Sequence, residues 1–312
     1  MLEKPKVLFV GSGKLGIPSL AKIANSNELD FLGVITQEDK PAGRKLHLTP
    51  TPVAAFAESN KIKVIKIKSI NSPDILSYIR SLKPDFIFLA SFGQLLKSEI
   101  LSIPLKEPLN LHGSLLPKYR GAAPIQAAIL NGENETGVSF MRMEKGLDTG
   151  PVFARFAVKI SSTDNSITLE EKLAKIASEN VVDVILKIYS NQLQPVSQDK
   201  MGQASYAPKI QKHDGLINWN ESAELIERKI RAYYPWPSAY TEFQIFGENY
   251  RFKIIKAKVV ASINSQPGIF LITRDNFVVS CGKDALELLV IHPDGRREIK
   301  ITDFIHRFHR HL

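Results

Sequence analysis

Residues 6–16 read KVLFVGSGKLG, and this stretch has the pattern of a strand that turns into a helix. Four consecutive apolar residues, 7–10, suit a strand buried on both faces, and the glycines after them suit a tight turn into a helix. Comparable apolar runs recur at residues 31–36, 62–67, 85–90 and 109–112. Helical patterns fall at residues 15–24, 52–59 and 72–82. Buried strands that alternate with helices predict an α/β domain with a mainly parallel sheet covered on both faces.

The chain after residue 112 continues this domain and then leaves it. Residues 137–143 and 152–160 look like two more strands. Thr168 and Glu171 have the spacing of a capping box, which predicts a helix that starts there and ends near Tyr189. Residues 191–205 are polar and have almost no pattern, so we interpret them as a linker between a domain of residues 1–190 and one of residues 206–312.

The last third of the chain has a β-rich texture. A short helical pattern at residues 226–232 is stopped by the prolines on either side of Trp236. Short strand-like pieces follow at residues 239–245, 250–260, 268–272, 276–280 and 285–291. Turn residues separate these pieces at short, irregular intervals, which predicts a small barrel or sandwich.

Composition limits the class of protein. The 312 residues favour two domains, and 44% hydrophobic with 23% charged residues is an ordinary globular composition. We expect neither a membrane span nor a secretory signal, because no apolar run approaches about 20 residues and the short N-terminal stretch before the first strand contains the charged residues Glu3, Lys4 and Lys6. The single cysteine, Cys281, allows no internal disulfide and fits the cytoplasm. The net charge of +9 favours an anionic partner, nucleic acid among them.

The glycines at positions 11, 13 and 16 match the G-x-G-x-x-G pattern of dinucleotide-binding turns. Glu38 and Asp39 stand where an acid that binds a ribose would be found. A single match is weak, because any tight turn from a strand to a helix favours glycine. The turn could therefore bind a nicotinamide cofactor, or its glycines could serve only the folding of the strand-to-helix turn.

Asn110 and His112 form the first candidate catalytic pair. Two residues apart on a strand, they would lie on one face at the carboxyl end of a parallel strand, where ligands bind. An amide beside an imidazole can polarise a carbonyl group and move a proton. Asp148, in a loop between Gly146 and Gly150, could pair with the imidazole. On the residues alone, a histidine at a strand end is more often structural than catalytic, and asparagine and aspartate often serve in turns; the sequence does not place Asp148 near His112.

Three motifs resemble those of the formyltransferases that use 10-formyltetrahydrofolate. The motifs are Asn110-x-His112-Gly-Ser-Leu-Leu-Pro, Tyr119-Arg-Gly-Ala-Ala-Pro-Ile-Gln126 and Gly146-Leu-Asp148-Thr-Gly. Residues 120–126 look specifically like the branch of this family that acts on methionyl-tRNA. Similar stretches at residues 36–44, 206–210 and 230–237 extend the resemblance over most of the chain.

The resemblance implies a fold and an activity. It implies a Rossmann-like N-terminal domain and a C-terminal β-barrel, similar to an OB-fold, that helps to bind tRNA. It implies that a monomeric cytoplasmic enzyme transfers a formyl group from 10-formyltetrahydrofolate to the α-amine of initiator methionyl-tRNA, with neither a metal nor NAD.

The resemblance also implies site residues. Asn110, His112 and Asp148 would be catalytic, and Arg44 and Lys45 would contact the acceptor end of the tRNA. The folate would lie against three short segments. They comprise Phe92, Gly93, Gln94, Leu95 and Leu96, then Ser114, Leu115, Leu116 and Pro117, and finally Gly146 and Leu147.

Other hypotheses stay open at the level of sequence. A sugar-nucleotide formyltransferase would share the catalytic residues, and a non-catalytic RNA-binding protein would share the scaffold. The basic residues of the last segment suit either phosphate contact or solvation; they are Arg296, Arg297, Lys300, Arg307 and Arg310. We expect no metal site at His306, His309 and His311, because they lack acidic or cysteine partners nearby.

Overall fold

The structure is a computed structural model, and it describes residues 3–42 and 47–308. The chain divides into two compact units. Unit 1 comprises Met1–Pro124, Glu135–Lys159 and Glu170–Ala207, and unit 2 comprises Ile125–Asn134, Ile160–Leu169 and Pro208–Leu312. In the described part of the chain, no helix combines the length and apolar character that crossing a membrane requires.

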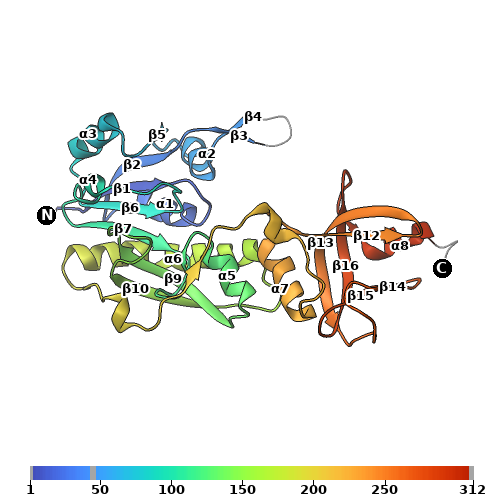
Figure 1. Ribbon diagram of the computed structural model, residues 1–312. Coiled ribbons are helices and arrows are strands. Elements are labelled where there is room, and N and C mark those ends of the chain that lie inside the picture. The colour runs from blue at the N-terminus through green and yellow to red at the C-terminus, as the bar shows by residue number, and fades with distance from the viewer. Residues whose placement is uncertain (1–2, 43–46, 309–312) are drawn as a thin grey trace. The chain divides into compact units, whose positions relative to one another are not determined.

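Unit 1 is built on a seven-stranded sheet with the order β10-β9-β7-β6-β1-β2-β5 (Figure 1). Its strands are β1 (Lys6–Gly11), β2 (Asp30–Gln37), β5 (Val64–Ile67), β6 (Phe86–Ala90), β7 (Glu107–His112), β9 (Glu135–Arg142) and β10 (Val152–Lys159). The five strands from β7 to β5 are parallel, whereas β9 and β10 run antiparallel to their neighbours. The prediction of a mainly parallel, Rossmann-like sheet is confirmed.

Helices and short ladders alternate with these strands along the chain. The helices of unit 1 are α1 (Ile17–Ala24), α2 (Pro52–Ser59), α3 (Pro73–Leu82), α4 (Ser98–Leu101) and most of α6 (Ser166–Tyr189), whereas α5 (Pro124–Leu130) belongs to unit 2 apart from its first residue. Two small ladders join β3 (Lys40–Ala42) to β4 (His47–Thr49) and β8 (Arg120–Gly121) to β11 (Tyr206–Ala207). A 3-10 helix, η1 (Gln198–Lys200), precedes β11.

The alternation of side chains along β1 explains why both faces are covered. Leu8 and Val10 point to one face and belong to a buried cluster with Ile79 of α3 and Ile100 of α4. Phe9 points to the other face, where its ring lies 5.8 Å from that of Phe88. Rings from β9 and β10 continue this aromatic row. Because both faces are buried, the strand is an uninterrupted apolar run.

The glycine-rich turn after β1 is a packing device. A Cβ atom on Gly11 would lie 2.7 Å from the carbonyl oxygen of Ala90, and one on Gly16 would lie 2.6 Å from the Ala90 side chain. A Cβ on Gly13 would lie 2.7 Å from that of Ser91. Asp39, a candidate for ribose binding, instead pairs with Lys66 at 2.8 Å. These contacts give each of the three glycines a packing role in the turn.

Helix α6 begins before the predicted capping box, so that prediction was wrong by a few residues. The side-chain oxygen of Asn165 accepts hydrogen bonds from the backbone N–H groups of Ile167 and Thr168, at 2.9 and 3.0 Å. Thr168 lies inside the first turn, and its hydroxyl donates to Asp164. Asparagine is at least as good an N-cap as threonine. Because Asn165 already accepts from two backbone N–H groups of the first turn, the helix begins after it and not after Thr168.

Unit 2 contains a curled antiparallel sheet with the order β12-β13-β16-β15-β14, and β17 pairs with β16 (Figure 1). Its strands are β12 (Ala239–Ile245), β13 (Glu248–Val260), β14 (Phe270–Ile272), β15 (Phe277–Ser280), β16 (Ala285–Pro293) and β17 (Ile299–Lys300). Its helices are η2 (Lys212–Gly215), α7 (Ala223–Tyr233), α8 (Ile301–Ile305) and η3 (His306–Phe308). Phenylalanines 243, 252, 277 and 304 fill the core, so the prediction of a small β-rich barrel-like domain is confirmed.

Candidate active site

Strand β7 places Asn110 and His112 on one face at its carboxyl end, as their spacing predicts. Asn110 is 7% exposed and His112 is 6% exposed. Asn110 pairs in register with Leu89 of β6 and Met141 of β9, so the strand is fixed on both sides. At its other end, Arg142 of β9 donates to both carboxylate oxygens of Glu107, and this hydrogen bond raises the pKa of Arg142. The two polar side chains therefore stand on a rigid element.

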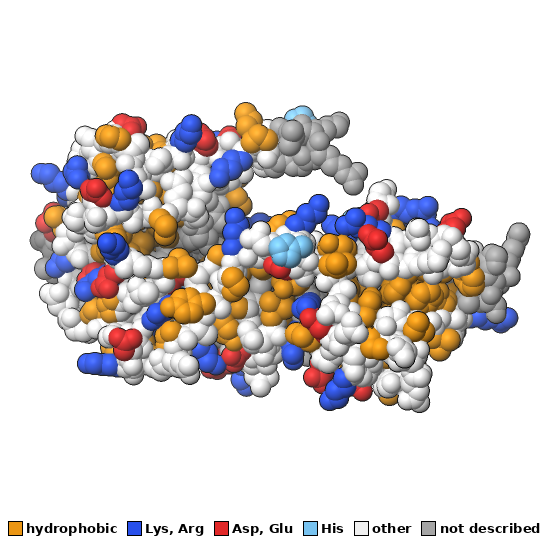
Figure 2. All heavy atoms as spheres, viewed as in Figure 1, with side chains coloured by type: hydrophobic (Ala, Val, Ile, Leu, Met, Phe, Trp, Pro, Cys, Tyr) orange, Lys and Arg blue, Asp and Glu red, His pale blue; other side chains and the backbone are white. Residues whose placement is uncertain are grey.

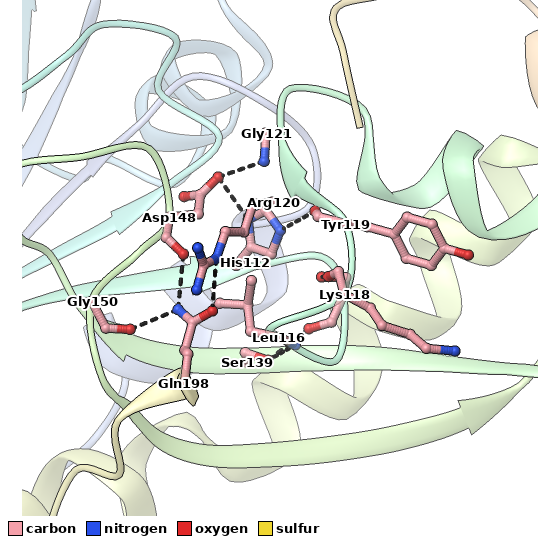
Figure 3. A network of polar contacts seen from close by, with 11 residues as sticks. His112, Leu116, Lys118, Tyr119, Arg120, Gly121, Ser139, Asp148, Gly150 and Gln198 are labelled. Carbon is pink, nitrogen blue, oxygen red and sulfur yellow. Dashed lines mark hydrogen bonds and ion pairs between the residues drawn. The ribbon is translucent and has the colours of Figure 1, made fainter. Parts of the chain in front are cut away.

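Both nitrogens of the His112 ring face protein acceptors (Figure 3). Nε2 lies 2.9 Å from the carbonyl oxygen of Tyr119. Because a carbonyl can only accept, Nε2 carries a proton in this arrangement. Nδ1 lies 3.6 Å from Oδ2 of Asp148, which is an ion-pair distance when the ring is doubly protonated. The imidazole is thus held in one orientation.

Asp148 reaches His112 from the loop between β9 and β10. Its backbone is left-handed, with φ at 52°, and its side chain is 14% exposed. Oδ2 accepts a hydrogen bond from the backbone N–H of Gly121 at 2.8 Å. A left-handed aspartate costs conformational free energy, so the surrounding contacts must hold it. The structure therefore brings together a histidine and an aspartate that are 36 residues apart in sequence.

The amide of Asn110 is different, because no described residue hydrogen-bonds to its side chain. An almost buried amide without a protein partner is available to a ligand. Together the three side chains offer a neutral donor, a fixed imidazole and a carboxylate. This set suits a reaction in which a carbonyl group is attacked by an amine, since it can stabilise the oxyanion and accept a proton.

The residues expected to contact folate fall into two structural classes. The first is packed into protein. Phe92 is 2% exposed within the cluster behind α3, and its carbonyl accepts from the Gln37 side chain. Ser114 is buried and donates to the Lys118 carbonyl at 2.6 Å. Leu115, Leu116 and Pro117 continue this turn, and Leu116 packs against Met141 and Val152.

The second class lies at the surface or is only partly buried. Leu95 is 77% exposed and Leu147 is 53% exposed, which is unusual for leucines in ordered loops. Gly93 and Gly146 both have positive φ and shape these loops. The side chain of Gln94 hydrogen-bonds to the backbone of Lys68 and Ile70, which ties the loop after β6 to the segment that follows β5. Leu96 is partly buried against the same cluster as Phe92.

The residues expected to contact tRNA were Arg44 and Lys45. Both lie outside the described residues, between β3 and β4. Within the residues that the structure covers, no three histidine, cysteine or acidic side chains come together as a metal site. His309 and His311 are not among those residues.

Sequence reasoning missed three groups in this network. The Tyr119 carbonyl and the Gly121 amide are backbone atoms, which no side-chain motif reveals. Gln198 comes from the segment interpreted as a linker, and it contacts Arg120, Asp148 and Gly150. Only its position in a polar stretch was visible in sequence, and that carries no signal of burial.

Comparisons with known proteins agree with this chemistry. Residues 5–185 match the family described as formyl transferase, and residues 209–309 match the formyl transferase C-terminal domain. The chain belongs to the formyl transferase family. This formyl transferase is 38% identical to a methionyl-tRNA formyltransferase of Caldanaerobacter subterraneus, over 96% of each chain. It is 37% identical to one of Thermodesulfovibrio yellowstonii, over 96% of this chain and 94% of that one. The resemblance noted in sequence is confirmed.

Solved structures share the fold of this formyl transferase. A methionyl-tRNA formyltransferase from Clostridium thermocellum matches with a TM-score of 0.57 and 17% identity, over 82% of this chain and 94% of that one. An N-formyltransferase from Helicobacter canadensis, in complex with folinic acid and dTDP-3-aminofucose, matches with a TM-score of 0.62 and 19% identity. That match covers 95% of this chain and all of the other. At these identities the matches establish the fold alone.

Proposed function

We propose that this formyl transferase moves a formyl group from 10-formyltetrahydrofolate to the α-amine of initiator methionyl-tRNA. The observation that carries the proposal is the similarity, over nearly the whole chain, to enzymes named for this reaction. The three polar side chains at the end of β7 supply groups that such a reaction needs. We further propose that the enzyme acts as a monomer in the cytoplasm.

The proposed mechanism follows from which atoms are free. The amine attacks the formyl carbon, and negative charge grows on the formyl oxygen. Asn110, whose amide has no described protein partner, donates to that oxygen. Asp148 keeps Oδ1 for the incoming amine because Oδ2 is engaged by Gly121 and faces His112. The amine loses its proton to the Asp148–His112 pair, the bond from the formyl carbon to N10 breaks, and N10 takes up a proton.

The folate contacts are proposed for the eleven residues predicted from sequence, with two kinds of role. Leu95 and Leu147 offer exposed apolar surface for direct contact. The buried segment from Ser114 to Pro117 would support the site through its backbone. Gly93 and Gly146 would keep the loop conformations, and neither position tolerates a Cβ atom without strain.

The tRNA contacts are proposed for both units. Arg44 and Lys45 would meet the acceptor end, and residues 206–312 would bind the body of the tRNA. Lys and Arg side chains are spread over the face in Figure 2, with Asp and Glu among them. The described basic residues near the C-terminus are exposed and suit phosphate contact; they are Arg296, Arg297, Lys300 and Arg307. If these residues are neutralised, the affinity for tRNA should depend less steeply on salt concentration. An unchanged salt dependence would show that they do not contact the tRNA.

A substrate panel tests the function. The purified chain is given 10-formyltetrahydrofolate with charged initiator tRNA, uncharged tRNA, or a dTDP-linked amino sugar. We expect formylation of the charged tRNA alone. The sugar nucleotide is included because a structural relative was solved with dTDP-3-aminofucose. Formylation of the sugar in place of the tRNA would overturn the proposal and favour a sugar-nucleotide formyltransferase.

A further inference from the structure

We propose that Gln198 is a positioning residue that holds Asp148 in its reactive conformation. The side chain comes from η1, 50 residues after Asp148, and it is 2% exposed. Gln198 donates from Nε2 to the carbonyl oxygens of Asp148 at 2.8 Å and Gly150 at 2.7 Å. Its Oε1 accepts from Nε of Arg120 at 2.9 Å. The inference rests on the proposed function, because it assumes that Asp148 acts in formyl transfer.

The three bonds of Gln198 join the two loops that meet at the Asp148 carboxylate (Figure 3). One segment is the loop that carries Asp148 itself, and the other contains the short strand β8 with Arg120 and Gly121. The Gly121 N–H donates a hydrogen bond to the Asp148 carboxylate. Gln198 therefore fixes the carboxylate and its donor relative to each other, although its own side chain touches neither. This is the pattern of a residue that acts through another.

The backbone of Asp148 explains why a clamp is needed. A left-handed aspartate persists only where its surroundings hold it. Both N–H groups of the Gln198 amide donate to backbone carbonyl oxygens, one of Asp148 and one of Gly150, so they fix the peptide group that follows each of these two residues. Glutamine suits this position because its amide offers two donors and an acceptor at one end. Glutamate would replace the NH2 group, which donates both bonds, with an oxygen that faces two carbonyl oxygens.

The same segment also supports His112. Ser205 accepts the backbone N–H of Tyr119 at 2.9 Å, and the Tyr119 carbonyl in turn faces Nε2 of His112. Beyond it, β11 pairs with β8 and so extends the contact along residues 206–207. Residues 198–207 thus support both partners of the Asp148–His112 pair. The segment interpreted from sequence as a linker contributes to the geometry of the proposed site.

The test combines Gln198→Met with Asp148→Asn in a double-mutant cycle. Single-turnover formylation of charged initiator tRNA is measured for each variant, with KM for both substrates. We expect Gln198→Met to lower the rate about 10- to 100-fold with KM nearly unchanged, because the carboxylate is misplaced. In the Asp148→Asn background the same change should cost less than about threefold. The matched control is Gln194→Met, since Gln194 is an exposed glutamine nearby with one bond to the Asn191 carbonyl.

A readout without catalysis keeps the inference falsifiable. Hydrogen exchange at the Gly121 amide should become faster in Gln198→Met, whereas exchange in β1 should not change. If Gln198→Met does not fold, Gln198→Asn, which keeps the amide group on a shorter side chain, is measured in the same way. A rate within about threefold of wild type, or an equal loss in both backgrounds, would overturn the inference. No formylation by the wild-type chain would instead overturn the proposed function.

Discussion

Asn110 is a side chain that we expect to affect the formylation rate much more than the stability of the fold. Its amide has no described hydrogen-bond partner, so its removal breaks no described hydrogen bond within the protein. We expect Asn110→Ala to lower the formylation rate by about 10²- to 10³-fold, the usual effect of losing an oxyanion donor. The free energy of unfolding should change by less than about 1 kcal/mol, because no protein hydrogen bond is lost.

The matched control for this prediction is Asn165→Ala. Asn165 caps α6 with two hydrogen bonds, so its loss should cost about 0.5–2 kcal/mol of stability and leave the rate unchanged. Denaturant unfolding and the formylation assay are run on both variants. Asn110→Ala should lower the rate and keep the stability, whereas Asn165→Ala should lower the stability and keep the rate. Strong destabilisation by Asn110→Ala would contradict it.

At the scale of single residues, the sequence predicted part of the site. The period of a strand was enough to put Asn110 and His112 on one face. The partnership of Asp148 with His112 came from family resemblance, since no local rule spans 36 residues. Gln198 was invisible because its three partners are fixed by tertiary contacts. The donors and acceptors that hold the pair are largely backbone atoms.

At the scale of elements, the ladder between β8 and β11 makes a strong demand on Gly121. Its φ is 116°, and a Cβ atom there would lie 2.5 Å from the carbonyl oxygen of Ala207. Gly202 has a similar φ of 131° but has nothing within 4 Å of such an atom. Gly202→Ala should therefore cost only the backbone strain, about 1–3 kcal/mol. Gly121→Ala should cost about 1–3 kcal/mol more, because the ladder must shift.

Denaturant unfolding of the two variants measures this difference. Equal losses of stability would mean that the β8–β11 ladder shifts without cost, and the tight packing inferred for residues 198–207 would then be wrong.

Most strands and helices could be predicted from apolar runs and periodicity. The short elements β8, β11 and η1 could not, because two or three residues carry no period.

At the scale of the whole molecule, Cys281 reports on the core of unit 2. It is 5% exposed, and burial raises the pKa of its thiol to about 11. The thiolate is the reactive form, so iodoacetamide should leave the native protein unlabelled at pH 8 and label it in denaturant. As the only cysteine, it makes the labelling site unambiguous. Rapid labelling of the native protein would contradict the described packing.

The same shift has a consequence for stability. Because the folded thiol has the higher pKa, it binds its proton more tightly than the unfolded thiol does. Its contribution to stability is full below the unfolded value near 9.0 and is lost as the pH rises through about 11. The unfolding free energy of wild type should fall over this range relative to that of Cys281→Ala. An equal fall in both would show that the thiol does not contribute.

We propose that the Asp148 carboxylate takes part in formyl transfer at the end of β7. The single-turnover rate of Asp148→Asn with charged initiator tRNA and 10-formyltetrahydrofolate tests this role. The amide keeps the shape of the side chain and removes its charge. We predict a rate at least about 100-fold below wild type, in the range of lost general acid–base catalysis. A rate within about threefold of wild type would contradict the account.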